Sequence, residues 1–225
     1  MMSNKKKYKL IKVLEHKECD EIIEKIQDTK LWLDGKLSAG KGIKHKKNNS
    51  EIDPKSEIYS DILNKLNLAF LKNKIIDQEF LRKRIITIII NRYKNNEAYN
   101  WHFDNEYMPC AFSNEPIRTD YSFTLFLNNN YEGGYLKIED VTVKPKKGYA
   151  CFYLSNKYHS VTTVKNGYRY GIVGWIESLV KDDEIRECIV NLSKIITDTF
   201  KSNTLNENDI KKLQEIKHTI FHKYL

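Results

Sequence analysis

The stretch RIITIIINRY, residues 84–93, marks the point at which the chain changes character. It is dominated by isoleucine, a β-branched residue that fits the pleated surface of a sheet. The longest patterned segments before it have helical spacing, whereas strand-like runs recur after it as far as Trp175. The stretch therefore predicts the first long strand of a β-rich core.

The runs that follow are short and are separated by turns. They are YSFTLFLN (121–128), YLKIEDVTV (135–143), YACFYL (149–154) and YRYGIVGWIES (168–178). Gly133, Gly134, Gly148 and Gly167 stand between these runs, and glycine adopts the positive φ angles that tight turns require. The pattern predicts a block of antiparallel strands.

Helical patterns flank this block on both sides. The expected outer elements are a strand at 8–14, helices at 17–28 and 56–72, and two amphipathic helices at 182–200 and 206–221. Between the first two helices, residues 33–50 are small, polar, glycine-bearing and basic, which predicts a loop. The fold class is therefore α+β with a β-rich core, a barrel or jelly roll flanked by N-terminal and C-terminal helices.

We expect one domain over residues 1–225, a length that is ample for a single hydrophobic core. Within it, residues 1–83 form an N-terminal strand and helices with the basic loop. Residues 84–178 form the β-rich core, and residues 179–225 form C-terminal helices, whose amphipathic faces are typical of packing or of a homo-oligomer contact.

The formal net charge of +8 comes largely from the lysine runs NKKK (4–7) and KGIKHKK (41–47). Such runs are typical of solvated surfaces. The sequence contains no zinc finger, phosphate-binding glycine loop or aromatic-studded basic motif beside them. Composition therefore disfavours a nucleic-acid partner.

The cysteines and the termini indicate the compartment. Cys19, Cys110, Cys151 and Cys188 are scattered without CxxC pairing, which favours a reduced chain. No apolar run is long enough to span a bilayer, and the N-terminus lacks the apolar region of a signal peptide. We expect a cytoplasmic protein without a membrane contact.

The stretch NWHFDNEYM (100–108) holds a histidine and an aspartate two residues apart. On a strand, His102 and Asp104 would point to the same face, and a second histidine, His159, follows the later strand YACFYL. Two imidazoles and one carboxylate can form a facial triad on Fe(II), which leaves three coordination positions open. The alternative is that these polar residues at strand ends simply face water.

Arg169 lies ten residues beyond His159, in the next strand. A guanidinium inside a β-rich core is costly unless it meets an anion, and its planar fork matches a carboxylate. If Arg169 faces inward, it could anchor a dicarboxylic acid whose other end chelates the metal, which points to 2-oxoglutarate. If it faces outward, it is an ordinary surface residue.

These residues carry a family resemblance. The set His102, Asp104, His159 and Arg169 resembles the 2-oxoglutarate/Fe(II)-dependent dioxygenases of the prolyl 4-hydroxylase-like branch. Longer segments resemble, in the right order, those of the bacterial PKHD-type hydroxylases: WLDGKLSAG (32–40) with KNN (47–49), NRYKNNEAYNWHFD (91–104), RTDYSFTLFLNNNYEGGYLKIED (118–140) and KYHSVTTVKNGYRYGIVGWIESLVKDD (157–183). The resemblance implies a double-stranded β-helix, or jelly roll, as the catalytic core.

The resemblance also implies roles for single residues. His102, Asp104 and His159 match the iron ligands, while Arg169 and Tyr93 match the pair that binds the distal carboxylate of 2-oxoglutarate. The chain departs from the family in two turns. Asparagines stand in YKNNEAY (93–99) where glycine is usual, and the turn before VTVKP is short. Asparagine tolerates left-handed backbone, so the first turn is expected to survive.

On the substrate side, Tyr99 and Trp175 match aromatic residues that line the pocket in prolyl hydroxylases. Arg118 is a further candidate for binding the substrate backbone, with a salt bridge to Asp120 as the alternative.

The resemblance implies an enzyme that hydroxylates an unactivated C–H bond of a prolyl residue in a protein or peptide and releases succinate and CO2. It also implies ascorbate as a supporting reductant. Three other interpretations remain open: a hydroxylase of a free amino acid or other small molecule, an oxidative demethylase of nucleic acid, which only the +8 charge supports, and a jelly roll that binds a ligand or partner without turnover.

Overall fold

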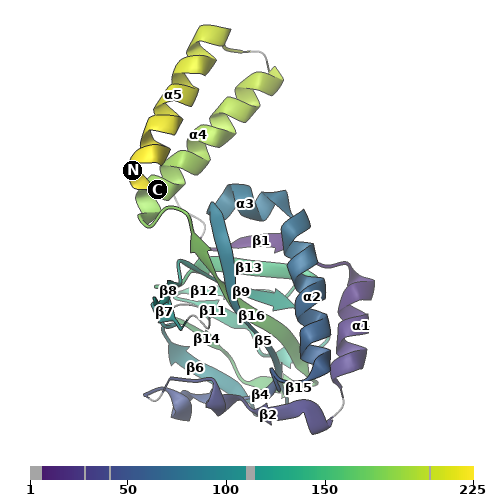
Figure 1. The fold of residues 1–225 in the computed structure, drawn as a ribbon. Helices are drawn as coiled ribbons and strands as arrows, with labels where there is room; N and C mark the ends of the chain where they lie inside the picture. The colour runs from purple at the N-terminus through teal and green to yellow at the C-terminus, as the bar shows by residue number, and fades with distance from the viewer. Residues whose placement is uncertain (1–6, 28, 41, 110–114, 203) are drawn as a thin grey trace.

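Two antiparallel sheets lie face to face at the centre of the computed structural model, which describes residues 7–27, 29–40, 42–109, 115–202 and 204–225 (Figure 1). The larger sheet has the strand order β1-β13-β9-β16-β5-β4-β2. Its strands are β1 (Lys9–Lys12), β2 (Trp32–Asp34), β4 (Ser50–Ile52), β5 (Arg82–Tyr93), β9 (Tyr121–Phe126), β13 (Tyr149–Leu154) and β16 (Arg169–Ser178).

The smaller sheet has the order β12-β11-β14-β6-β3. Its strands are β3 (Lys47–Asn48), β6 (Ala98–His102), β11 (Leu136–Ile138), β12 (Val141–Val143) and β14 (His159–Val161). Two short ribbons join β10 (Glu132–Gly133) to β15 (Val164–Asn166) and β7 (Tyr107–Met108) to β8 (Ile117–Arg118). The architecture is the predicted jelly roll with helices at both ends of the chain, so the fold class is confirmed.

Three helices, α1 (His16–Ile26), α2 (Glu57–Lys72) and α3 (Lys74–Phe80), pack against the larger sheet (Figure 1). Their buried side chains meet those of the sheet in the main core, as the apolar spacing predicts. A second core cluster, which includes Phe126, Leu136 and Tyr153, fills the space between the two sheets. The helical core therefore supports the larger sheet from outside, which keeps the inner face available for a site.

The chain ends in a helical hairpin, α4 (Asp183–Ser202) and α5 (Glu207–Tyr224), that projects away from the sheets (Figure 1). The hairpin contacts α3 through Lys194, midway along α4, which pairs with Glu79 at 2.7 Å. Within the described residues, none of the helices is both long and apolar enough to cross a bilayer.

Three local features differ from the sequence-based expectation. Residues 135–143, expected as one strand, form the hairpin β11–β12, because Glu139 turns the backbone at a φ of 52°. The expected loop at 33–50 contains the end of β2, all of β3 and the first residue of β4, together with the 3-10 helices η2 (Gly35–Leu37) and η3 (Lys44–Lys46). A third 3-10 helix, η1 (Thr29–Leu31), precedes β2. The seven-residue helix α3 was not expected.

Two finer expectations can be compared directly with the structure. Asn96 has a φ of 66°, which confirms that asparagine supports the left-handed turn before β6. Cys19, Cys151 and Cys188 are free thiols, whereas Cys110 lies outside the described residues. The division of the chain into one domain with the three segments given above stays a prediction.

Candidate metal and cosubstrate site

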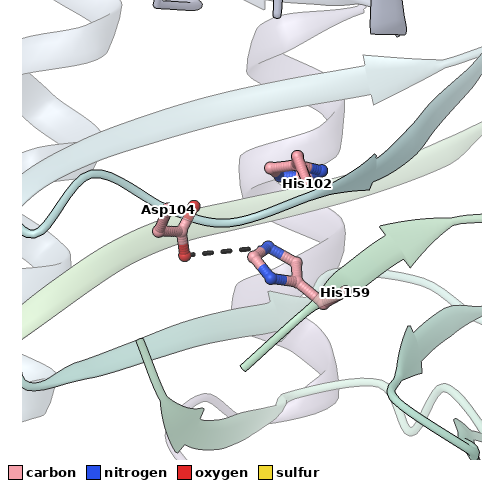
Figure 2. A group of neighbouring side chains, drawn as sticks. All are labelled: His102, Asp104 and His159. Carbon is pink, nitrogen blue, oxygen red and sulfur yellow. Dashed lines mark ion pairs between the residues drawn. The ribbon is translucent and has the colours of Figure 1, made fainter. Parts of the chain in front are cut away.

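The residues predicted to form a triad meet between two paired strands. His102 ends β6, His159 begins β14, and the two are direct partners in the antiparallel register, with ring centroids 4.3 Å apart. Asp104 lies two residues beyond the end of β6, and its Oδ2 is 3.7 Å from His159 Nε2 (Figure 2). Ligand atoms of all three residues lie within 4.8 Å of one another, close enough to surround one ion.

Both imidazoles are oriented in the same way, by a hydrogen bond between the ring and a backbone carbonyl. The Nδ1 of His102 lies 2.7 Å from the carbonyl oxygen of Asn100, and the Nδ1 of His159 lies 2.9 Å from that of Lys157. A carbonyl only accepts hydrogen bonds, so each Nδ1 carries the proton and donates it. Each Nε2 is thus left unprotonated, which is the form that binds a metal.

Burial keeps the imidazole of His102 neutral. His102 and His159 are 4% and 5% exposed. Desolvation by burial, assisted by the neighbouring His159, lowers the pKa of His102 to about 4. At neutral pH the His102 ring is therefore uncharged and ready to act as a ligand.

A serine that the sequence analysis did not single out contacts the acidic member of the triad. Ser122 Oγ on β9 is 2.5 Å from Asp104 Oδ2 and 3.0 Å from Ser155 Oγ. The signal in the sequence is weak, because a serine within a strand is common and only the fold brings residue 122 to residue 104.

Arg169 faces inward and is almost completely buried, at 1% exposure. It begins β16 opposite Tyr93 on β5, and its guanidinium carbon lies 5.1 Å from the centroid of the Tyr93 ring. Its Nη1 is 3.4 Å from Asn91 Oδ1, whereas its Nε and Nη2 have no hydrogen-bond partner among the described residues. A buried cation with unused donors is the feature expected of an anion site.

A cavity opens between the two sheets beside the triad, with an empty volume of about 730 Å³ including its mouth. Its lining contains the three triad residues together with Tyr93, Tyr99 and Trp175. Asn91 also lines it, so both neighbours of Arg169 face the cavity although Arg169 itself does not reach its surface.

The substrate-side candidates differ in position. Tyr99 stacks on the imidazole of His102 at 3.5 Å between centroids, and burial raises its pKa. The indole Nε1 of Trp175 is buried without a partner among the described atoms. Arg118 lies outside the cavity lining and binds both carboxylate oxygens of Asp120, at 2.8 and 2.9 Å. The structure therefore brings Tyr99 and Trp175 to the site but engages Arg118 elsewhere.

The basic loop contributes a buried ion pair to the cavity wall, which the sequence analysis did not predict. Lys47 Nζ contacts Glu51 Oε1 at 2.5 Å and Ser38 Oγ at 2.7 Å, and both charged side chains are at most 10% exposed. The same ammonium lies 5.3 Å from the ring of Tyr99. This pair is therefore connected to His102 through a single aromatic ring.

Comparisons with known proteins agree with this geometry. Residues 88–177 match the model of the 2OG-Fe(II) oxygenase superfamily, a span that contains the triad and Arg169. The chain is 34% identical over 205 residues to a PKHD-type hydroxylase of Acinetobacter baumannii, covering 87% of this chain and 89% of that protein. It is 31% identical over 199 residues to PKHD-type hydroxylase YbiX of Escherichia coli, with coverages of 86% and 88%. Among solved structures, a Pseudomonas putida prolyl-4-hydroxylase shares the fold with a TM-score of 0.50 at 18% identity, over 77% of this chain and 94% of that one.

Proposed function

Since this chain belongs to the PKHD-type hydroxylases of the 2OG-Fe(II) oxygenase superfamily, we propose that it hydroxylates a prolyl residue in a protein or peptide. The family makes it an iron-dependent and 2-oxoglutarate-dependent oxygenase. The observation that carries the proposal is the pairing of a His-Asp-His cluster on the smaller sheet with a buried, incompletely paired arginine on the larger sheet.

We assign iron binding to His102, Asp104 and His159. The donor set fits Fe(II), because both free Nε2 atoms and a carboxylate oxygen converge within 4.8 Å. When bound, the iron supplies oxygen activation that couples oxidation of 2-oxoglutarate to succinate and CO2 with hydroxylation of a C–H bond. The protein's part is to orient both reactants and to keep water away from them.

Binding of the distal 2-oxoglutarate carboxylate is assigned to Arg169 and Tyr93. The unused Nε and Nη2 donors of Arg169 support this role, since a carboxylate can accept two parallel N–H bonds from a guanidinium. Tyr93 adds a hydroxyl-bearing ring that contacts Arg169 and lines the cavity.

The target side of the cavity is assigned to Tyr99 and Trp175. Both line the cavity next to the triad, and Tyr99 lies directly on His102. A prolyl target is supported by the likeness of the fold to the Pseudomonas prolyl-4-hydroxylase and by the family motifs quoted above. A free amino acid or other small molecule is the second candidate, because a prolyl side chain and a small molecule both need only a small cavity. Ascorbate as a reductant belongs to the same proposal.

A second copy of the chain is proposed as a partner through the C-terminal hairpin. Exposed apolar side chains support this proposal: Ile195, Phe200 and Ile216 are each about half exposed on α4 and α5. Sedimentation velocity at rising concentration measures this association.

The test of the function is succinate release with Fe(II) and 2-oxoglutarate, with the protein and small-molecule fractions of a cell lysate added separately. His159→Ala serves as the blank and should abolish release, because one ligand is lost. Arg169→Ala should mainly raise the 2-oxoglutarate concentration required.

Stimulation by the protein fraction, followed by a mass increase of one oxygen on a prolyl residue, is the expected result. Stimulation by the small-molecule fraction alone would replace the prolyl target with the second candidate. Undiminished release by the His159 variant would refute the ligand assignment.

A further inference from the structure

Asp104 differs from the two histidines in how its position is fixed. His102 and His159 are held by a β ladder and by their own carbonyl contacts, whereas Asp104 lies in irregular backbone beyond the end of β6. An aspartate carboxylate rotates easily about its last torsion, so its orientation has to be set by what it touches.

The contact that sets the orientation of the Asp104 carboxylate comes from the larger sheet. Ser122 Oγ lies 2.5 Å from Asp104 Oδ2, and Ser122 is only 2% exposed. Its backbone is held on both sides, because Ser122 pairs with Tyr153 of β13 and with Trp175 of β16. A hydroxyl on the rigid larger sheet is therefore bonded to a carboxylate on the irregular edge of the smaller one.

The direction of the hydrogen bonds follows from the donors available. A carboxylate accepts only, so the single proton of Ser122 goes to Asp104. The Oγ of Ser122 also lies 3.0 Å from the Oγ of Ser155, which is itself 5% exposed. Ser122 therefore lies between Ser155 and Asp104, and its bond to the carboxylate is charge-assisted.

We propose that Ser122, supported by Ser155, is a positioning residue that fixes the Asp104 carboxylate for metal binding. This inference rests on the proposed ligand set. A hydrogen bond to one carboxylate oxygen favours ligation through a single oxygen, which preserves the open positions that a cosubstrate and dioxygen need. Without it the carboxylate turns freely, binds the ion less tightly and presents both oxygens to it.

The test measures binding of Co(II), a stand-in for Fe(II) that is stable in air, by its visible absorption in the full-length protein. Ser122→Ala should weaken the apparent affinity about 10- to 100-fold, the usual cost of losing a residue that orients a metal ligand. It should also change the intensity or position of the Co(II) bands, because the coordination number changes. Ser155→Ala should shift affinity in the same direction by a smaller factor.

Ser178→Ala is the matched control. Ser178 is fully buried on β16, and its hydroxyl bonds to the carbonyl of Phe80 at 2.8 Å, so its loss has a comparable structural cost outside the cavity lining. Its Co(II) affinity and spectrum should equal those of the unaltered protein. An equal loss in Ser178→Ala, or no change in Ser122→Ala, would overturn the proposal.

One further variant, His102→Ala, separates the possible failures. His102→Ala should abolish Co(II) binding; if it does not, the ligand set itself is wrong. If His102→Ala abolishes Co(II) binding and Ser122→Ala binds Co(II) normally, only the positioning role of Ser122 is refuted. Should Ser122→Ala not fold, the affinity of Ser155→Ala decides. That variant keeps Ser122 and removes only the hydroxyl beside it, and normal Co(II) binding by it refutes the proposal.

Discussion

Arg169 illustrates the conflict between stability and function at the scale of one residue. Its guanidinium is buried, and two of its nitrogens have no partner among the described residues. Its charge is offset by a long contact with Asn91 Oδ1 at 3.4 Å and by the rings of Tyr93 and Phe126, at 5.1 and 5.8 Å. Cation–π contacts of this kind contribute up to about 2 kcal/mol, less than the cost of burying an incompletely paired charge.

Replacement of Arg169 by an apolar residue of similar length should therefore stabilise the protein in the absence of 2-oxoglutarate. Arg169→Met is expected to raise the free energy of unfolding by about 1–4 kcal/mol, the range seen when buried charges are replaced by well-packed apolar groups. The same variant should lose the increase in stability that 2-oxoglutarate gives the unaltered protein. Urea unfolding with and without 2-oxoglutarate measures both effects.

Arg84→Met, which removes an exposed partner of Glu177, is the control and should change stability by about 1 kcal/mol or less. A destabilised Arg169→Met that keeps its response to 2-oxoglutarate would show that Arg169 has a structural role instead.

The residue types of the site could be predicted from the sequence, but its fine arrangement could not. His102, Asp104 and His159 are recognisable because few residue types bind iron. The expected strand face is not what joins His102 to Asp104, since β6 ends at His102 and Ser122 holds the carboxylate from another sheet. A contact across the barrel leaves no local pattern in the sequence.

At the scale of elements, the segment from β3 to β4 joins the two sheets beside the cavity. Lys47 on β3 pairs with Tyr99 of the smaller sheet, while Glu51 on β4 pairs with Asn91 of the larger one. The Lys47–Glu51 ion pair therefore bridges the sheets at the edge of the site. The small, polar and basic composition of residues 33–50 predicts a loop. The strands that form there are only two or three residues long, and their stability comes from pairing with β5 and β6, which composition does not reveal.

Removal of one partner of this buried pair should be costly. Lys47→Met leaves the carboxylate of Glu51 buried beside Ser38 without its cation, and we expect a loss of about 3–5 kcal/mol in the free energy of unfolding. The double variant Lys47→Met with Glu51→Leu should recover most of that loss, because no uncompensated charge remains. Chemical denaturation of the two single variants and the double variant measures the coupling.

The exposed pair Lys211–Glu215 on α5 provides the comparison, and Lys211→Met should change stability by about 1 kcal/mol or less. Equal effects at positions 47 and 211 would mean that the buried pair is no more important than a surface one.

At the scale of the whole molecule, Asp120 links the jelly roll to the C-terminal hairpin. Its carboxylate accepts two hydrogen bonds from Arg118 and one from the backbone N–H of Ser178 at 2.7 Å. Arg186 of α4 lies 3.5 Å from the same carboxylate. One acidic side chain thus ties the start of β9 to the end of β16 and to the first turns of α4.

The helices of the hairpin could be predicted from their apolar spacing, but their attachment to the core could not. The spacing shows which face of a helix is buried and not what it is buried against. Arg118 shows the consequence: the sequence left substrate binding and a salt bridge open, and the structure contains the salt bridge because Asp120 lies in the short link between β8 and β9. The pair gives the RTD motif a structural role.

Loss of the Asp120 charge should therefore weaken the whole assembly. Asp120→Asn leaves Arg186, which is 2% exposed, buried without its counter-charge, and we expect a loss of about 3–5 kcal/mol in the free energy of unfolding. Urea unfolding measures the loss, and Asp198→Asn, an exposed change on α4, should leave stability within about 0.5 kcal/mol. The folded Asp120→Asn protein should bind Co(II) as the unaltered protein does, because Asp120 does not line the cavity. A loss of metal binding at undiminished stability would instead place Asp120 in the site, and would return Arg118 with it to the substrate side.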